Sequence, residues 1–243
     1  MNLSKKEMQK FGENHLKSFF EKLEEVISKN TFDLIVGAGN SGAGMTKLVK
    51  IYFDVKHKKC PKTIKIPFYR SWQKPDLNFL EKETRKRLDK TKVKSILFVD
   101  DEIGKGETFN GVMGLLVKII KPTKKLKVYL IAETKGIKRS FRVANCEVHF
   151  NPFARSIAKK MYNIITYCVP LEINRVLENH PELEQSQKFN ILLSEPIKEI
   201  KNHKPYYTHK WETILNNKVK NFKIQQEKLV CFVKNKINGL NSQ

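Results

Sequence analysis

Apolar residues recur along this chain in two alternating patterns, and together these predict an α/β protein. Short apolar runs, typical of strands buried on both faces, occur at residues 32–37, 63–69, 95–99, 127–132 and 146–150. Between them, apolar residues return at helical spacing over residues 45–52 and 109–120. Because strands alternate with helices, we expect a parallel sheet with right-handed crossovers.

Both ends of the chain are predicted to be helical. Residues 4–27 carry one apolar stripe, and Ser4 and Glu7 have the spacing of a capping box. After residue 150 the chain becomes rich in helical patterns and lysine, with helices predicted over residues 153–165 and 215–237. We therefore expect two parts. The first is an α/β core with its N-terminal helix over residues 1–150, and the second is a basic, helix-rich cap or appendage over residues 151–243.

The stretch from Arg70 to Lys94 differs from its surroundings. It is rich in charge, contains Pro75 and has few apolar residues to anchor it, although residues 81–88 have some helical character. Long connections of this kind often serve as active-site lids. We predict a mobile loop here.

Composition narrows the class of protein. Hydrophobic residues make up 40% of the 243 residues and aromatic residues 10%, which is enough for a buried core. No apolar run approaches the roughly 20 residues of a membrane helix, and the N-terminus lacks the apolar segment of a secretory signal. We expect a soluble, cytoplasmic protein that does not bind membranes.

The cysteines and histidines indicate no metal site built by the protein alone. The four cysteines are scattered without CxxC spacing, and none of the six histidines forms an HxxxH or HExxH pattern. Reduced thiols in a reducing compartment are the expected state.

The formal charge is +22, from 47 lysines and arginines against 25 acids. Such a charge attracts polyanions, but here it is spread along the whole chain. A nucleic-acid partner is therefore a weaker alternative than a solvated basic surface. A phosphate-rich small substrate would also suit this charge. The sequence leaves a homo-oligomer possible.

The segment that carries most chemistry is Ile96 to Thr108, ILFVDDEIGKGET. Its apolar residues predict a buried strand that brings Asp100 and Asp101 to the carboxyl edge of the sheet, where open α/β sheets bind ligands. Two adjacent carboxylates can accept hydrogen bonds from the vicinal hydroxyls of a ribose. They can also approach a magnesium ion that a substrate carries.

The residues after the acid pair have the character of a phosphate loop. Gly104 and Gly106 allow a tight turn, so that backbone N–H groups up to Thr108 can converge on a phosphate. The helix predicted to start near Thr108 directs its positive end to the same place. Diol and phosphate together predict recognition of a ribose 5-phosphate.

This segment resembles the phosphoribosyl diphosphate loop of type I phosphoribosyltransferases, which has four apolar residues, two acids and a small-residue turn ending in threonine. Asp100, Asp101, Ile103, Gly106 and Thr108 fit that pattern. The resemblance implies a Rossmann-like parallel sheet and a transferase (a glycosyltransferase of nucleotide metabolism). Its reaction would move a 5-phosphoribosyl group between phosphoribosyl diphosphate and a nitrogenous base, with Mg²⁺ bound to the substrate and pyrophosphate as co-product. The acceptor base is not specified.

The resemblance assigns roles along the chain. The contacts of the ribose 5-phosphate would come from Gly104, Lys105, Gly106, Glu107 and Thr108. Pyrophosphate would be held by Gly39, Asn40, Ser41 and Gly42, and Arg70 would act with Asp100 and Asp101 in catalysis. Residues 71–94 would be the flexible lid, although Lys82, Arg85, Lys86 and Arg87 are more simply solvated charges than catalytic groups.

Three positions depart from the family pattern. Glu102 replaces an apolar residue, Gly104 removes the aspartate used by 6-oxopurine salvage enzymes, and Lys105 replaces a phosphate-binding hydroxyl. Lys105 could supply a cationic contact instead, or it could mark a loop without turnover. The alternative function is a non-catalytic relative that senses phosphoribosyl diphosphate or a nucleotide, with a regulatory or nucleic-acid-linked role.

Other interpretations of the same residues are less complete. Gly37, Gly39 and Gly42 match a dinucleotide-binding GxGxxG, but the next strand ends in Tyr69 and Arg70 without the expected acid. A Walker B-like site would need a GxxxxGK[ST] loop, which is absent. A receiver-type acidic pocket would leave the glycines unexplained. Phe150 and Phe153 could stack on a base, although core packing is the simpler use for both.

Overall fold

The computed structural model describes residues 5–66, 68, 74–88, 92–134, 140–153, 231, 234, 235 and 237–239. Ser4 and Arg70 lie outside these residues. So do all but the first residue of the helix predicted over residues 153–165 and almost all of the predicted C-terminal cap. The fold below is that of the described part.

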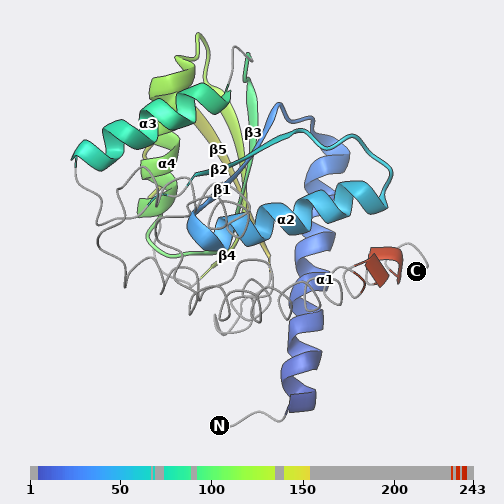
Figure 1. The fold of residues 1–243 in the computed structure, drawn as a ribbon. Coiled ribbons are helices and arrows are strands. Elements are labelled where there is room, and N and C mark those ends of the chain that lie inside the picture. Colours follow the sequence, from blue (N-terminus) through green and yellow to red (C-terminus); the bar gives the residue numbers. More distant parts are fainter. Residues whose placement is uncertain are drawn as a thin grey trace, which may run out of the picture.

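The core is a five-stranded sheet in which every strand pair is parallel, in the order β2-β1-β3-β4-β5 (Figure 1). The strands are β1 Leu34–Ala38, β2 Lys62–Ile66, β3 Ser95–Ile103, β4 Leu126–Thr134 and β5 Cys146–Phe153. The predicted parallel α/β sheet is thereby confirmed. Among the strand bounds that differ from the prediction, two matter for the site and the chain after it. β3 continues through the acid pair, and β5 continues to Phe153, so the helix expected from residue 153 does not begin there.

Four helices cover the two faces of this sheet: α1 Lys5–Lys29, α2 Gly39–Val55, α3 Lys74–Leu88 and α4 Glu107–Ile120. Figure 1 shows α1 and α2 on one face and α3 and α4 on the other. Side chains alternate accordingly along β3, since Leu97 and Val99 join the core under α1 and α2, whereas Ile96 and Phe98 join the core under α3 and α4. The result is a three-layer α/β/α core.

The predicted N-terminal helix is confirmed, and its described second half is part of the core. Phe19 lies edge-on to Phe153, with ring centroids 5.5 Å apart, and Phe20 stacks on Tyr52 of α2 at 6.1 Å. Phe150 packs against Phe141 at 5.5 Å. Phe153 is buried, so the core-packing interpretation of this residue is confirmed.

Near the C-terminus, one described residue lies in this core and another forms an ion pair on the surface of α2. Ile237 is fully buried among the side chains of the α1 and α2 face. Lys234 forms an ion pair with Asp54 of α2 at 3.4 Å. The described C-terminal residues therefore pack on the same face of the sheet as α1.

The prediction of a mobile, poorly anchored loop over residues 71–94 is wrong for most of its length. Residues 74–88 form α3, and Leu80, Thr84 and Leu88 are buried in its interface with the rest of the molecule. Glu81 of α3 also accepts a hydrogen bond from Lys118 of α4 at 2.5 Å. Positions 80, 84 and 88 share one helical face. The sequence did not predict this buried face because its middle residue is a threonine, which interrupts the apolar spacing.

Within the described residues, no helix combines the length and the apolar character needed to cross a membrane.

Candidate functional site

The strand order creates one place in the sheet where the chain reverses its direction of winding. β1 lies between β2 and β3, so the connection after β1 leads to one side and the later strands are added on the other side. In open parallel sheets, ligands bind beside the carboxyl ends of the strands at such a switch point. Both predicted ligand loops begin here, because Gly37 near the end of β1 is the register partner of Val99 in β3.

Gly39, Asn40, Ser41 and Gly42, the residues expected to form a loop that holds pyrophosphate, instead form the first turn of α2 directly after β1. Gly39 begins α2 and has a φ of +58°, a left-handed conformation that favours glycine. The backbones of Gly37 and Gly42 touch: a Cβ atom added to Gly42 would lie 2.8 Å from Cα of Gly37 and 3.3 Å from the carbonyl oxygen of Val99. The first turn of α2 is therefore seated directly on β1, beside β3.

Asp100 and Asp101 lie in the last part of β3 and not in the loop after it. The pairing of β3 with β4 shifts its register between Val99 and Glu102, and such irregularities often re-aim side chains beside active sites. One oxygen of Asp100 accepts a hydrogen bond from the backbone N–H of Asp101 at 3.0 Å. One oxygen of Asp101 accepts from the N–H of Glu102 at 2.8 Å. The backbone thus orients both carboxylates, with Asp100 buried and Asp101 partly exposed.

The two glycines of the next turn are not equivalent. Gly106 precedes the first residue of α4 with a φ of +92°, and a Cβ atom there would lie 3.2 Å from the carbonyl oxygen of Ser140. Gly104 has no positive φ and has open space at its Cβ position. The backbone conformation therefore favours glycine at residue 106, whereas a Cβ atom at residue 104 would meet no other atom. Lys105 between them is exposed, Glu107 begins α4, and Thr108 follows in its first turn.

A neighbouring segment braces this turn, and sequence analysis missed it. The side chain of Asn110 donates a hydrogen bond to the carbonyl of Ser140 at 2.8 Å and accepts one from the N–H of Arg142 at 3.2 Å. Between these contacts, Phe141 packs against Phe109 of α4 with ring centroids 5.2 Å apart. The only signal in the sequence was Asn110, one of several polar residues at the start of a mostly apolar helix.

The electrostatics of the site combine positive and negative groups. The starts of α2 and α4 follow Ala38 and Gly106, which provide no capping side chain, so both helices present the positive end of their dipole at this edge. Acidic side chains share the edge: Glu102 is the register partner of the buried Glu133, next to the acid pair. The edge can therefore offer N–H donors to an anion and carboxylate acceptors to hydroxyl groups.

Carboxylates at this edge are also potential ligands of a metal ion. No group of three or more His, Cys, Asp or Glu side chains with a metal-binding arrangement occurs in the described residues. Magnesium is commonly held by one or two carboxylates together with substrate phosphates. Asp100 and Asp101 suit that second arrangement, because they supply oxygen ligands at the edge where the two loops meet.

The remaining predicted residues are Arg70 and four cations of the predicted lid. Arg70 lies outside the described residues. Lys82 and Arg87 are exposed on α3, while Arg85 and Lys86 line a groove near the opposite edge of the sheet. Arg85 pairs with Glu81 at 2.9 Å and Lys86 with Glu83 at 2.6 Å. The interpretation of these four residues as solvated charges is supported.

No protein-family model, curated protein or solved structure matched the chain. What is established is therefore a five-stranded, all-parallel α/β fold with an N-terminal helix.

Proposed function

We propose that this protein is a phosphoribosyltransferase that binds phosphoribosyl diphosphate at the carboxyl ends of β1 and β3. One observation carries the proposal. Two segments that are far apart in sequence, the glycine-rich first turn of α2 and the turn before α4, follow neighbouring strands at the switch point of the sheet. A sheet in which only one of these segments reached the switch point would not support a ligand with phosphate groups at both ends.

The acid pair and the turn after it would hold the ribose 5-phosphate. Asp100 and Asp101 have carboxylates oriented by backbone N–H groups, which prepares them to accept hydrogen bonds from the two ribose hydroxyls. The 5-phosphate would lie against the turn from Gly104 to Thr108 at the positive end of α4, with Lys105 as a cationic contact. The brace from Asn110 would keep this turn in shape.

The pyrophosphate group would lie at the start of α2. The turn from Gly39 to Gly42 is close to β3 because of the contact between Gly37 and Gly42, so the two ends of one ligand can reach both loops. Magnesium would enter with the substrate and neutralise part of the charge of the pyrophosphate and of the acid pair. Arg70 keeps its proposed role beside the leaving group.

The proposed reaction is a displacement at C1 of the ribose. A nitrogen atom of the acceptor base forms a bond to C1 with its lone pair, and the bond from C1 to the pyrophosphate oxygen breaks with its electrons leaving on pyrophosphate. The protein contributes by positioning both reactants and by stabilising the charge that develops. Because α3 is anchored by buried side chains, it does not serve as a lid in this proposal.

The direct test replaces the acid pair. Asp100→Asn with Asp101→Asn should lower the affinity for magnesium phosphoribosyl diphosphate on the order of 100-fold, since two charge-assisted hydrogen bonds are weakened. Calorimetric titration would measure the affinity. Glu21→Gln with Glu147→Gln is the matched control, because it removes two exposed acids elsewhere and should leave binding unchanged. Equal affinity of the acid-pair variant and the unmodified protein would contradict the proposed site.

The second candidate is a non-catalytic relative that senses phosphoribosyl diphosphate or a nucleotide. Lys105 favours the sensor. This residue is exposed in the turn where type I phosphoribosyltransferases, the family that the segment resembles, have a phosphate-binding hydroxyl. Release of pyrophosphate, followed over a panel of purine, pyrimidine and other nitrogenous bases, separates the two candidates. Tight, saturable binding with no release for any base would establish the sensor in place of the enzyme.

A further inference from the structure

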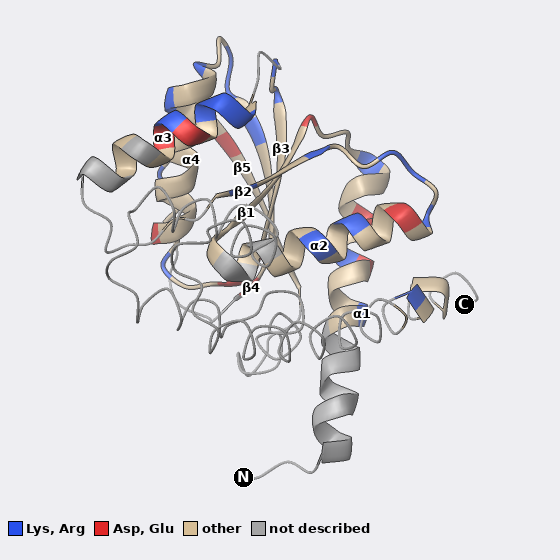
Figure 2. Cartoon of the chain, viewed as in Figure 1, with Lys and Arg blue, Asp and Glu red and all other residues tan. Residues whose placement is uncertain are grey.

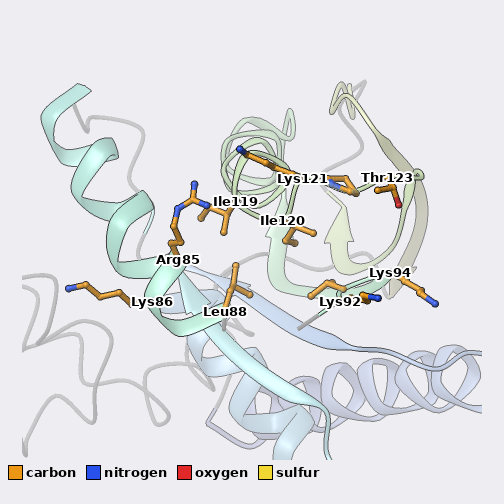
Figure 3. Close-up of a pocket in the computed structure, with 11 residues that line it drawn as sticks. Arg85, Lys86, Leu88, Lys92, Lys94, Ile119, Ile120, Lys121 and Thr123 are labelled. Carbon is orange, nitrogen blue, oxygen red and sulfur yellow. The ribbon is translucent and has the colours of Figure 1, made fainter. Parts of the chain in front are cut away.

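A basic groove of about 820 Å³ lies at the amino edge of the sheet, the edge opposite to the candidate site. It is formed where the C-terminal ends of α3 and α4 meet the segment that leads into β3 (Figure 3). Five of its eleven lining residues are cationic, and none of the eleven is acidic. The five cations are Arg85, Lys86, Lys92, Lys94 and Lys121.

The cations surround an apolar centre. Figure 3 shows Leu88, Ile119 and Ile120 between them, with Arg85 and Lys86 on one side and Lys92 and Lys94 on the other. Figure 2 shows that lysines and arginines gather on α3, at the start of β3 and on the connection before β4. The positive charge therefore comes from three separate segments that converge on one groove.

Three of these cations are not needed for local ion pairs. Arg85 and Lys86 pair with glutamates of their own helix, whereas Lys92, Lys94 and Lys121 have no ion-pair partner in the described part of the chain. Lysines near helix C-termini can simply offset the helix dipole. Two helix ends contribute only about −1 elementary charge together, so three unpaired lysines leave a clear excess of positive charge.

We infer that this groove binds the phosphodiester backbone of a nucleic acid without regard to its sequence. No aromatic side chain lines the groove on which a base could stack, and Thr123 is the only neutral hydrogen-bonding side chain among the lining residues. The lining is therefore dominated by cations, which suit contacts with phosphates, and phosphate contacts carry no sequence information.

The form of the groove favours a nucleic acid over an acidic protein. Duplex DNA carries one charge about every 1.7 Å along its axis, so cations on separate walls of a groove all meet a phosphate. An acidic peptide must instead match its carboxylates to each cation. The total charge of +22 would attract a polyanion from a distance.

The test measures binding of the full-length protein to labelled nucleic acids by fluorescence anisotropy. Two duplexes of about 20 base pairs with unrelated sequences should bind equally well. A plot of the logarithm of the affinity against the logarithm of the salt concentration should have a slope of about −3 to −5. The triple variant Lys92→Gln, Lys94→Gln, Lys121→Gln should bind at least about tenfold more weakly. The magnitude of its salt-dependence slope should decrease by about 3.

A matched control removes the same charge elsewhere. Lys50→Gln, Lys59→Gln and Lys62→Gln replace three exposed lysines outside the groove, and this variant should lose less than about threefold in affinity. Lys121 has a φ of +50°, so Lys92→Gln with Lys94→Gln serves as a second groove variant if the triple variant is unstable. For this variant, the magnitude of the salt-dependence slope should decrease by about 2.

Four results would overturn the inference. These are equal losses in the groove and control variants, no binding at about 50 mM salt, no dependence on salt, and polyglutamate binding as tight as that of nucleic acid. The last result would assign the groove to an acidic protein partner. Asp100→Asn with Asp101→Asn should bind nucleic acid normally, because the acid pair lies at the other edge of the sheet.

Discussion

Gly37 at the end of β1 and Gly42 in the first turn of α2 are in direct backbone contact. A Cβ atom added to Gly37 would lie 2.1 Å from the carbonyl oxygen of Gly42, far inside any possible van der Waals contact. No side chain fits between the strand and the helix at this point. The contact sets where α2 begins, and hence where its positive end lies relative to Asp100 and Asp101.

Gly42→Ala should destabilise the protein by about 2 kcal/mol or more, because the new methyl group would meet backbone atoms that cannot rotate away. Urea unfolding would measure the change. Gly114→Ala is the control: this glycine lies within α4 with open space around it, so alanine should be neutral or stabilise by up to about 1 kcal/mol. Similar losses in both variants would contradict the packing described.

Gly104 and Gly106 should respond differently to the same substitution. Gly106→Ala should cost about 1–2 kcal/mol, since its φ of +92° is unfavourable for a residue with a Cβ atom. Gly104→Ala should change stability by less than about 0.5 kcal/mol. Denaturant unfolding gives both values, and titration with magnesium phosphoribosyl diphosphate should show weaker binding for the Gly106 variant. If Gly106→Ala proves harmless, the turn does not have the shape described.

The anchoring of α3 can be tested with two neighbouring substitutions. Leu80→Ala should destabilise the protein by about 2–5 kcal/mol, because Leu80 is fully buried and leaves a cavity. Lys82→Ala, at an exposed position of the same helix, should have an effect within about 0.5 kcal/mol. A mobile lid would instead leave stability unchanged in both variants, so equal effects near zero would restore the lid hypothesis.

Cys146 should react slowly with thiol reagents. Burial raises the pKa of its thiol to about 11, so at pH 8 only roughly one molecule in a thousand carries the reactive thiolate. Alkylation by iodoacetamide, followed at each cysteine by mass spectrometry, should be much slower at Cys146 than at the exposed Cys231. The rate at Cys146 should still rise as the pH approaches 11. A plateau by about pH 10 would show that the thiol has an ordinary pKa.

Much of the fold could be predicted because burial leaves a direct mark on the sequence. Strands such as Ile96 to Val99 are covered by helices on both faces and read as continuous apolar runs. Acids and glycines at the ends of such runs could be assigned to the carboxyl edge for the same reason. Helix α3 was mistaken for a loop because its buried stripe contains Thr84, whose polar character broke the apolar spacing.

The brace at Asn110 could not be predicted, since it depends on which segment lies beside the start of α4. Ser140 and Arg142 are distant in sequence from Asn110. Their backbone groups lie beside its side chain because β4 pairs with β3. The basic groove could not be predicted for the same reason. Its cations belong to three segments, and each segment taken alone has the pattern of an ordinary solvated surface.

The sequence by itself determined the alternation of strands and helices and the types of residue in each ligand loop, because hydrophobic periodicity and backbone preference are local properties. The tertiary structure decided which loops are neighbours. Strand order placed the turn at Gly39 beside the acid pair at Asp100, and it separated both from the lysines at the other edge. Strand order depends on contacts between residues far apart in the chain, which no local pattern records.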